Sequence, residues 1–158
     1  MKRKMKRKEI VNELKKYFGV KELVCKHTYD RFGENSWQFL DTEYLHNLLV
    51  IRRDILGIGM VCNNWHSGGK YTQRGFRCNI CQLVKNATNQ GRVYLTAHAN
   101  GCGGDFTPMG MTAEDARQKI KANQSKLPYP LRLENAVSWL HMDTYDYLNG
   151  NKINTFNG

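Results

Sequence analysis

The sequence has little proline and few cysteines, with 3 prolines and 5 cysteines among 158 residues, beside 14 glycines. These counts exclude a collagen-like chain, a low-complexity chain and a disulfide-dense miniprotein. No apolar run approaches the roughly 20 residues that a membrane-spanning helix needs. The remaining composition, 41% hydrophobic and 24% charged, is that of one ordinary domain with enough residues for a core.

The first residues do not have the pattern expected of an export signal. The basic start is followed by residues 9–16, which are too polar for the apolar core of a secretory signal. A transit peptide would be rich in serine and poor in acidic residues, and this segment is neither. We therefore expect synthesis in a reducing cytoplasm, where the odd number of cysteines does not pair completely.

The formal net charge of +10 is concentrated at the start of the chain. Residues 1–16 hold eight Lys/Arg and two Asp/Glu, a net charge of +6, which leaves +4 for residues 17–158. We interpret residues 1–8 as a basic arm. Such an arm could bind an anionic cell wall or a nucleic acid. It could equally be a solvated helix end that aids solubility.

Hydrophobic periodicity and turn residues predict one α+β domain over residues 9–148, with a mostly antiparallel central sheet flanked by helices. Asp41 and Thr112 are expected to cap two of the helices. The expected helices cover residues 9–17, 42–56 and 113–123. The expected strands cover residues 58–62, 92–95, 105–107, 131–133 and 137–142. Residues 63–75 are predicted to form a long loop, and residues 149–158 a loose tail.

Two imidazoles and a carboxylate give the strongest chemical signal. His98 and Asp105 flank a glycine-rich segment, and His141 follows 36 residues after Asp105. This set suits a zinc ion with three protein ligands and a fourth position open to water. The glycines would let His98 and Asp105 converge from adjoining strands. A loop histidine, a turn aspartate and a strand histidine would explain the same residues, so spacing alone leaves both interpretations open.

The pattern resembles the M15 metallopeptidases, which include zinc D-Ala-D-Ala carboxypeptidases and phage endolysins. Their motif is Ser-x-His-x-x-Gly-x-Ala-x-Asp, followed later by Trp-x-His-x-Asp/His. Residues 96–105 are similar to the first part, with Thr96 for Ser and Gly103 for Ala, and residues 139–143 are similar to the second. Four upstream segments extend the resemblance in order, so that it covers roughly residues 18–145: residues 18–25, 51–57, 63–65 and 74–77.

This resemblance implies the hedgehog/DD-peptidase fold and a zinc peptidase that hydrolyses peptidoglycan stem peptides. The activity would be that of a D,D-carboxypeptidase or of an endolysin-type endopeptidase, with Zn²⁺ held by His98, Asp105 and His141. A phage or prophage origin would fit the compact single domain and the missing export signal. We expect a monomer without a membrane span that acts at the cell wall after release. Its partner would be the peptidoglycan peptide, and the basic arm would aid binding to the anionic wall.

Arg77 is the expected anion partner in such a site. Its planar guanidinium suits a peptide carboxylate, and the family uses an arginine at the matching position for substrate binding or oxyanion stabilisation. Arg74 is the alternative. Trp65 and Tyr71 are expected to form one wall of the cleft, and Thr96 is expected to contact substrate.

The general base is left with alternatives. Family members often carry an acidic residue or a histidine three positions before the last zinc histidine, where this chain has Ser138. Glu134 is the first candidate, although a two-residue turn at residues 135–136 would set it opposite Val137, about 13 Å along an extended strand from His141. Asp143 shares a strand face with His141 and is either the base or a partner that orients an imidazole. The third possibility is that neither carboxylate acts as the base.

Cys78 and Cys81 form a lone C-x-x-C motif. With a further thiol they would build a second, structural zinc site, although the usual paired motif is missing and incidental buried thiols are the preferred explanation. The candidate third thiols are Cys25, Cys62 and Cys102. His27 has no recognisable partner spacing.

Two alternatives belong to other functional classes. The first is a catalytically inactive, zinc-containing binding module of the same fold, which Ser138 would support. The second is a nucleic-acid-binding protein that uses the basic arm, with strongly salt-dependent binding.

Overall fold

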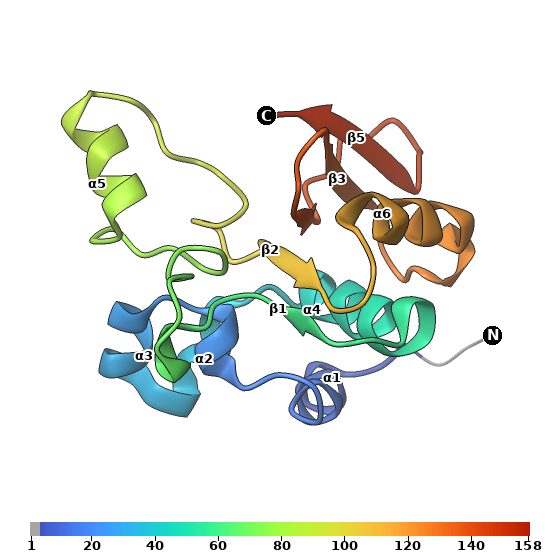
Figure 1. The fold of residues 1–158 in the computed structure, drawn as a ribbon, viewed down its shortest axis with the longest axis horizontal. Helices are drawn as coiled ribbons and strands as arrows, with labels where there is room; N and C mark the ends of the chain where they lie inside the picture. Colours follow the sequence, from blue (N-terminus) through green and yellow to red (C-terminus); the bar gives the residue numbers. More distant parts are fainter. Residues whose placement is uncertain (1–3) are drawn as a thin grey trace.

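A five-stranded mixed sheet organises the chain in the computed structural model, which describes residues 4–158 (Figure 1). The strand order is β1-β2-β4-β3-β5. Three of the four pairings are antiparallel, whereas β5 runs parallel to β3. The predicted α+β class is confirmed. The strands are β1 Met60–Val61, β2 Gly103–Pro108, β3 Leu131–Asn135, β4 Leu140–Asp143 and β5 Ile153–Asn157.

Within residues 4–158, six α-helices accompany the sheet. They are α1 Arg7–Leu14, α2 Val20–Leu23, α3 Lys26–Phe32, α4 Thr42–Val50, α5 Gln82–Asn89 and α6 Ala113–Ala122. The side chains of Asp41 and Thr112 accept hydrogen bonds from the first turns of α4 and α6, as the capping signals predicted. A π-helical segment, Ile51–Leu56, extends α4 and ends at Gly57, which has a positive φ.

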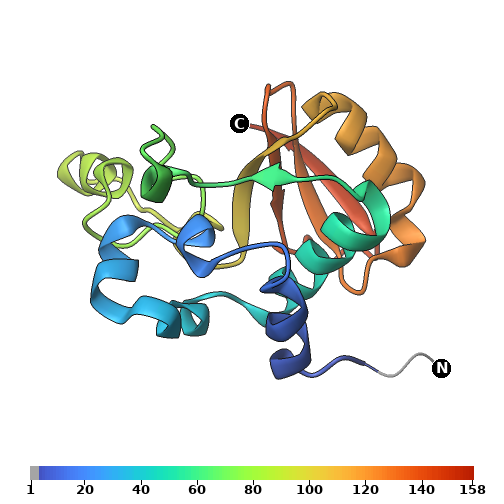
Figure 2. The same ribbon diagram turned by 60° about the horizontal axis from the view of Figure 1, so that its bottom comes forward.

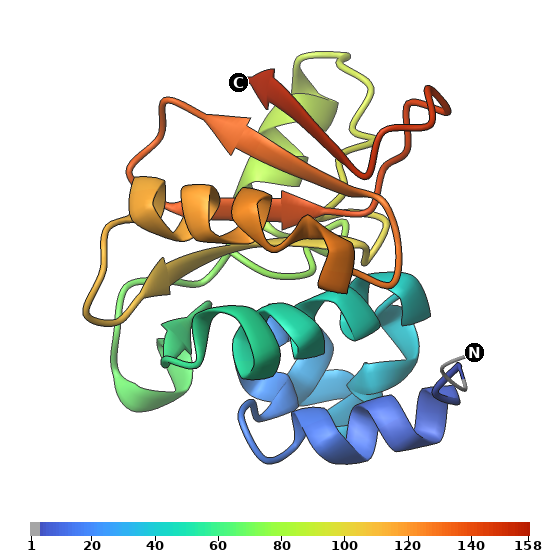
Figure 3. The same cartoon turned by 90° about the vertical axis from the view of Figure 1, so that its right-hand side faces the viewer.

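The two faces of the sheet differ in chemistry. Leu131, Leu133, Leu140 and Met142 have no exposed surface and point into the main core. Helix α6 lies across that face (Figure 3), and its Arg117 donates hydrogen bonds to the carbonyls of Val137 and Trp139. Because side chains alternate along a strand, the polar residues of the same strands project from the opposite face. That face holds the candidate site.

Some predicted elements differ from the structure. Residues 149–158 are not loose, because β5 extends the sheet beside β3. Residues 92–96 form no strand, and β4 begins at Leu140 rather than at residue 137. Helix α5 was not anticipated.

The basic arm lies partly outside the described residues, since the description begins at Lys4. Its last two residues, Arg7 and Lys8, start α1. The Arg7 guanidinium donates to Thr42 Oγ1 and to the carbonyl of Trp37, each at 2.7 Å, so this end of the arm is part of the fold. Nowhere in residues 4–158 does a helix combine the length and apolarity needed to cross a membrane.

Candidate metal centre

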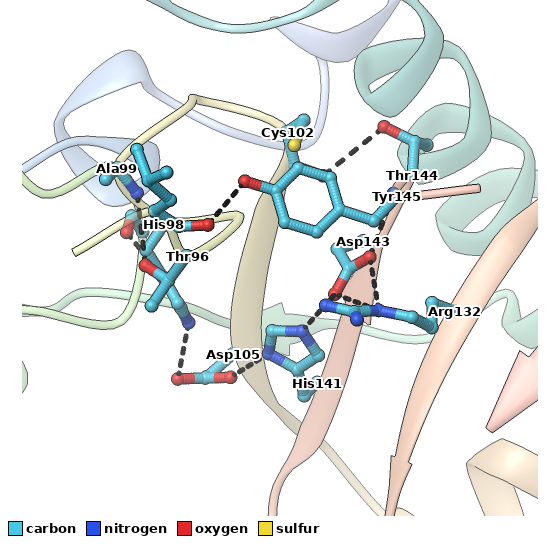
Figure 4. Close-up of polar contacts among 12 residues, drawn as sticks. Thr96, His98, Ala99, Cys102, Asp105, Arg132, His141, Asp143, Thr144 and Tyr145 are labelled. Carbon is cyan, nitrogen blue, oxygen red and sulfur yellow. Dashed lines mark hydrogen bonds and ion pairs between the residues drawn. The ribbon is translucent and has the colours of Figure 1, made fainter. Parts of the chain in front are cut away.

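The sheet brings the three predicted ligands together. Asp105 on β2 is the register partner of His141 on β4, so their side chains leave the same face. His98 reaches the pair from the loop that precedes β2 (Figure 4). One donor atom from each of the three residues lies within 4.8 Å of the other two.

Hydrogen bonds fix the orientation of both imidazoles. Nδ1 of His141 lies 2.7 Å from Asp105 Oδ1, and its Nε2 lies 2.7 Å from Asp143 Oδ2. Nε2 of His98 faces Asp105 Oδ2 at 3.3 Å, and its Nδ1 lies 2.9 Å from the Gly75 carbonyl. Each ring thus presents one nitrogen to the shared centre and anchors the other on an outer oxygen. This is how metal-ligating histidines are commonly held, so the donor set fits zinc.

The electrostatics of the centre favour a positive charge. Burial raises the pKa of Asp105, but the hydrogen bonds from His141 and His98 outweigh it and hold that pKa well below its usual range. Burial lowers the pKa of His141, but its hydrogen bonds to Asp105 and Asp143 outweigh it and raise the pKa to about 9. The His141 ring lies between two carboxylates that favour its positively charged form, and a cation at Nδ1 would satisfy the same carboxylates.

Two glycines allow the ligand loop to approach its neighbours. Gly101 has a φ of +68°, and a Cβ there would lie 1.9 Å from the carbonyl oxygen of Phe39. A Cβ on Gly103 would lie 2.7 Å from the Cβ of Asp143, its register partner. Larger residues at either position would displace the loop that carries His98.

A cavity of about 400 Å³ opens over this face. Six of the residues predicted for the site line it: Arg77, Thr96, His98, Asp105, Glu134 and His141. Side chains that the sequence did not single out complete the lining, among them Arg132, Tyr145 and Phe156. The Phe156 ring contacts the His141 ring edge to face, at 5.6 Å between centroids.

Glu134 lines the same cavity, in a strand register that the sequence did not predict. The β3–β4 pairing joins Arg132 to Asp143 and Leu133 to Met142, and one further step sets Glu134 opposite His141. The expected two-residue turn is therefore wrong, because four residues, 136–139, connect the strands, with Ala136 at a φ of +58°. Ser138 lies exposed in this connection.

Asp143 is fully engaged. It has no exposed surface, and its carboxylate binds His141, the Arg132 guanidinium at 2.9–3.1 Å, and the peptide N–H of Tyr145 at 3.0 Å. Burial raises its pKa, but the hydrogen bonds from His141 and Arg132 outweigh it, so the pKa is lowered. Of its two predicted roles, the geometry favours orienting the imidazole over acting as base.

Arg77 lies beside the ligands. Its guanidinium is 3.6 Å from Asp105 Oδ2 and donates to the Tyr94 hydroxyl at 2.6 Å, while its peptide N–H donates to the His98 carbonyl. The alternative, Arg74, instead donates to Thr107 Oγ1. The geometry therefore favours Arg77 as the anion partner.

Trp65 and Tyr71 do not form the expected wall of this cavity. The indole N–H of Trp65 donates to the Val24 carbonyl, and the Arg74 guanidinium covers the Tyr71 ring at 4.2 Å. Asn64 closes their loop on itself by accepting from the peptide N–H of Tyr71. Aromatic residues from later in the chain, Trp139 and Tyr145, line the cavity instead.

A second group of potential metal ligands lies outside this cavity: Cys25, His27, Cys78 and Cys81. All five cysteines are free thiols. The C-x-x-C motif was noted in the sequence, but its partner Cys-x-His was not. The Cys25-x-His27 pair was the sequence signal that could have revealed this group. About 50 residues separate it from the C-x-x-C pair, so the link between them is not visible in the sequence.

The chain was compared with family models, curated proteins and solved structures. No protein-family model, curated protein or solved structure matches the chain. The functional argument therefore depends on the residues and their arrangement.

Proposed function

We propose that this protein is a zinc-dependent peptidase of the M15 type that hydrolyses peptidoglycan stem peptides. One observation supports the proposal above all: a buried His98–Asp105–His141 donor set lies in a cavity together with Glu134 and Arg77. The cavity thus contains a candidate metal site, a carboxylate that could act as general base and a guanidinium that could bind an anion. Metal-assisted peptide hydrolysis uses these three kinds of group. The order of the motifs along the chain agrees with the family resemblance.

His98, Asp105 and His141 would hold the zinc ion, which when bound would supply Lewis acidity to polarise a peptide carbonyl and lower the pKa of water. The chain's own residues complete the reaction. Glu134 takes the proton from the attacking water on a carboxylate oxygen and returns it to the leaving amine. Glu134 thereby provides the acidic group that Ser138 cannot.

Arg77 provides a fixed positive charge for the substrate. Its partner Tyr94 and the nearby Asp105 carboxylate hold the guanidinium beside the ligands. From there it stabilises the developing oxyanion or binds a terminal carboxylate of the stem peptide. Arg132, the other arginine of the lining, is neutralised by Asp143 and is not available for the same task.

The cavity volume of about 400 Å³ lies within the range of small-ligand sites and suits a short peptide segment.

The products of a D,D-carboxypeptidase and of an endopeptidase differ, so the assay must detect both. Action at the cell wall, with residues 1–8 as an accessory to wall binding, belongs to the same proposal.

The test is digestion of purified peptidoglycan by the zinc-loaded protein, with detection of free D-Ala and of new amino termini. Glu134→Gln should lower the rate by about 10²- to 10⁴-fold, the contribution of a general base, while zinc content stays unchanged. Glu34→Gln, an exposed carboxylate elsewhere, serves as the matched control. Bound zinc without any product release would instead favour the inactive binding module.

A further inference from the structure

Four potential ligands converge at one end of the molecule, away from the cavity. Cys25 and His27 stand at the start of α3, and Cys78 and Cys81 directly precede α5. Figures 1 and 2 show α3 and α5 at the same end of the chain's fold, opposite α6. All four donor atoms lie within 4.8 Å of one another.

The distances match a tetrahedral metal site. The Sγ atoms of Cys78 and Cys81 are 3.8 Å apart, and they lie 3.6 and 3.7 Å from Nδ1 of His27. Bonds of about 2.3 Å to sulfur and about 2.0–2.1 Å to nitrogen place tetrahedral ligands about 3.8 Å apart for two sulfurs and about 3.5 Å for sulfur and nitrogen. A disulfide would need the two sulfurs at about 2.0 Å.

The local packing supplies a reason for such a site. Cys25 and Cys81 form a small apolar cluster with Val84, separate from the main core. Around it, Leu83 is 44% exposed and Val93 is 82% exposed, so little apolar burial holds α5 in place. Small units of this kind commonly depend on a metal instead of a core.

We propose that Cys25, His27, Cys78 and Cys81 bind a structural zinc ion as a Cys₃His site. Four protein ligands close the coordination shell, which leaves no position for water or substrate and separates this site from the catalytic one. His27 is exposed and Cys78 is partly exposed, so the ion can reach the ligands from solvent. The inference is independent of the proposed peptidase activity.

The site would also position Arg77, the residue before Cys78. The peptide N–H of Cys25 donates to the Phe76 carbonyl at 3.0 Å, and the peptide N–H of Phe76 donates to the Leu23 carbonyl at 2.9 Å. Backbone hydrogen bonds thus join residues 23–25 to Phe76, which directly precedes Arg77. An ion bound by Cys25 and Cys78 would hold these two segments together. Its loss would loosen Arg77 without removing a ligand of the catalytic centre.

Metal analysis of purified protein tests the proposal by stoichiometry. The wild type should hold two zinc ions, and Cys81→Ser and His141→Ala should each hold one. Cys62→Ala, a buried thiol outside the group, should keep two. Equal zinc content in Cys81→Ser and wild type would overturn the structural site, whereas loss confined to His141→Ala would leave only the catalytic one.

Cobalt substitution identifies the ligands of each ion. Thiolate-to-cobalt charge-transfer absorption should persist in His141→Ala and disappear in Cys81→Ser. Because Cys81→Ser could fail to fold, thiol titration of the wild type gives a second measurement: chelation should raise the reactivity of Cys25, Cys78 and Cys81 together. Unchanged thiol reactivity, or a disulfide between Cys78 and Cys81 in the purified protein, would overturn the proposal.

Discussion

Asp143 holds the outer nitrogen of His141, with Oδ2 at 2.7 Å from Nε2. The carboxylate has no exposed surface, and Arg132 fixes it in turn. A hydrogen-bonded carboxylate of this kind fixes the tautomer of a ligand imidazole and raises its basicity. Asp143 therefore belongs to the candidate metal centre as a residue that would orient a ligand without touching the ion.

Asp143→Asn should weaken zinc binding at the candidate metal centre by about 10- to 100-fold, the usual effect of losing such a partner. The amide still accepts a hydrogen bond from Arg132 but carries no charge to stabilise the imidazole. Competition with a chromophoric chelator measures the affinity, and exposed Asp146→Asn is the control. Equal zinc affinities in Asp143→Asn and wild type would contradict the orienting role.

Arg77→Lys should lower kcat/KM for peptidoglycan hydrolysis by about 10²-fold, because lysine cannot reproduce a planar guanidinium at an oxyanion or carboxylate. Zinc content should not change, since Arg77 is not a ligand. Arg74→Lys is the matched control, because its guanidinium donates to Thr107 outside the cavity lining. A larger loss in Arg74→Lys than in Arg77→Lys would reverse the assignment.

The sequence was sufficient to predict those parts of the site that depend on short segments. His98, Asp105 and His141 lie in motifs of a few residues, and alternation along β4 correctly predicts that His141 and Asp143 share a face. The position of Glu134 depends instead on strand register. The connection 136–139 sets that register, and its positive φ falls on Ala136, which carries none of the usual turn chemistry.

Long-range pairing explains the other differences. The polar residues of β5 indicate a loose tail when read alone, and only the parallel pairing with β3 makes them an edge strand. His27 has no visible partner because Cys78 and Cys81 follow more than 50 residues later in the chain. The aromatic loop that holds Trp65 and Tyr71 was wrongly assigned to the cleft, since its composition does not reveal that it closes on itself through Asn64.

Gly101→Ala should destabilise the protein more than Gly91→Ala. Both glycines have positive φ, +68° and +66°, so alanine carries a backbone strain of about 1–2 kcal/mol at either position. Only at Gly101 would the Cβ also meet a backbone atom, Phe39 O at 1.9 Å, whereas nothing lies within 4 Å at Gly91. The forced shift should add about 1–3 kcal/mol.

Urea denaturation of the two glycine variants measures this difference directly. Gly91→Ala reports the strain alone, and the additional loss in Gly101→Ala reports the close approach of the ligand loop to Phe39. Equal free energies of unfolding for the two variants would show that the loop relaxes without cost.

His46 on α4 should make stability depend on pH. Its Nδ1 is buried without a hydrogen-bond partner among the described residues, and its ring packs edge to face on Tyr129 at 5.9 Å. Burial, followed by the positive charges of Arg53 and Lys4, lowers its pKa below the ordinary value of 6.5. In the range between the two pKa values, the unfolded chain binds more protons than the folded one, so stability falls as pH falls below about 6.5.

His46→Phe removes this titration and keeps a ring against Tyr129. The free energy of unfolding, measured with chelator present at about pH 7.5 and about pH 5.5, should therefore fall less on acidification in His46→Phe than in wild type. All other titrating groups are common to both proteins, so their contributions cancel in the comparison. A difference between variant and wild type that is the same at both pH values would show that His46 does not destabilise the fold on protonation.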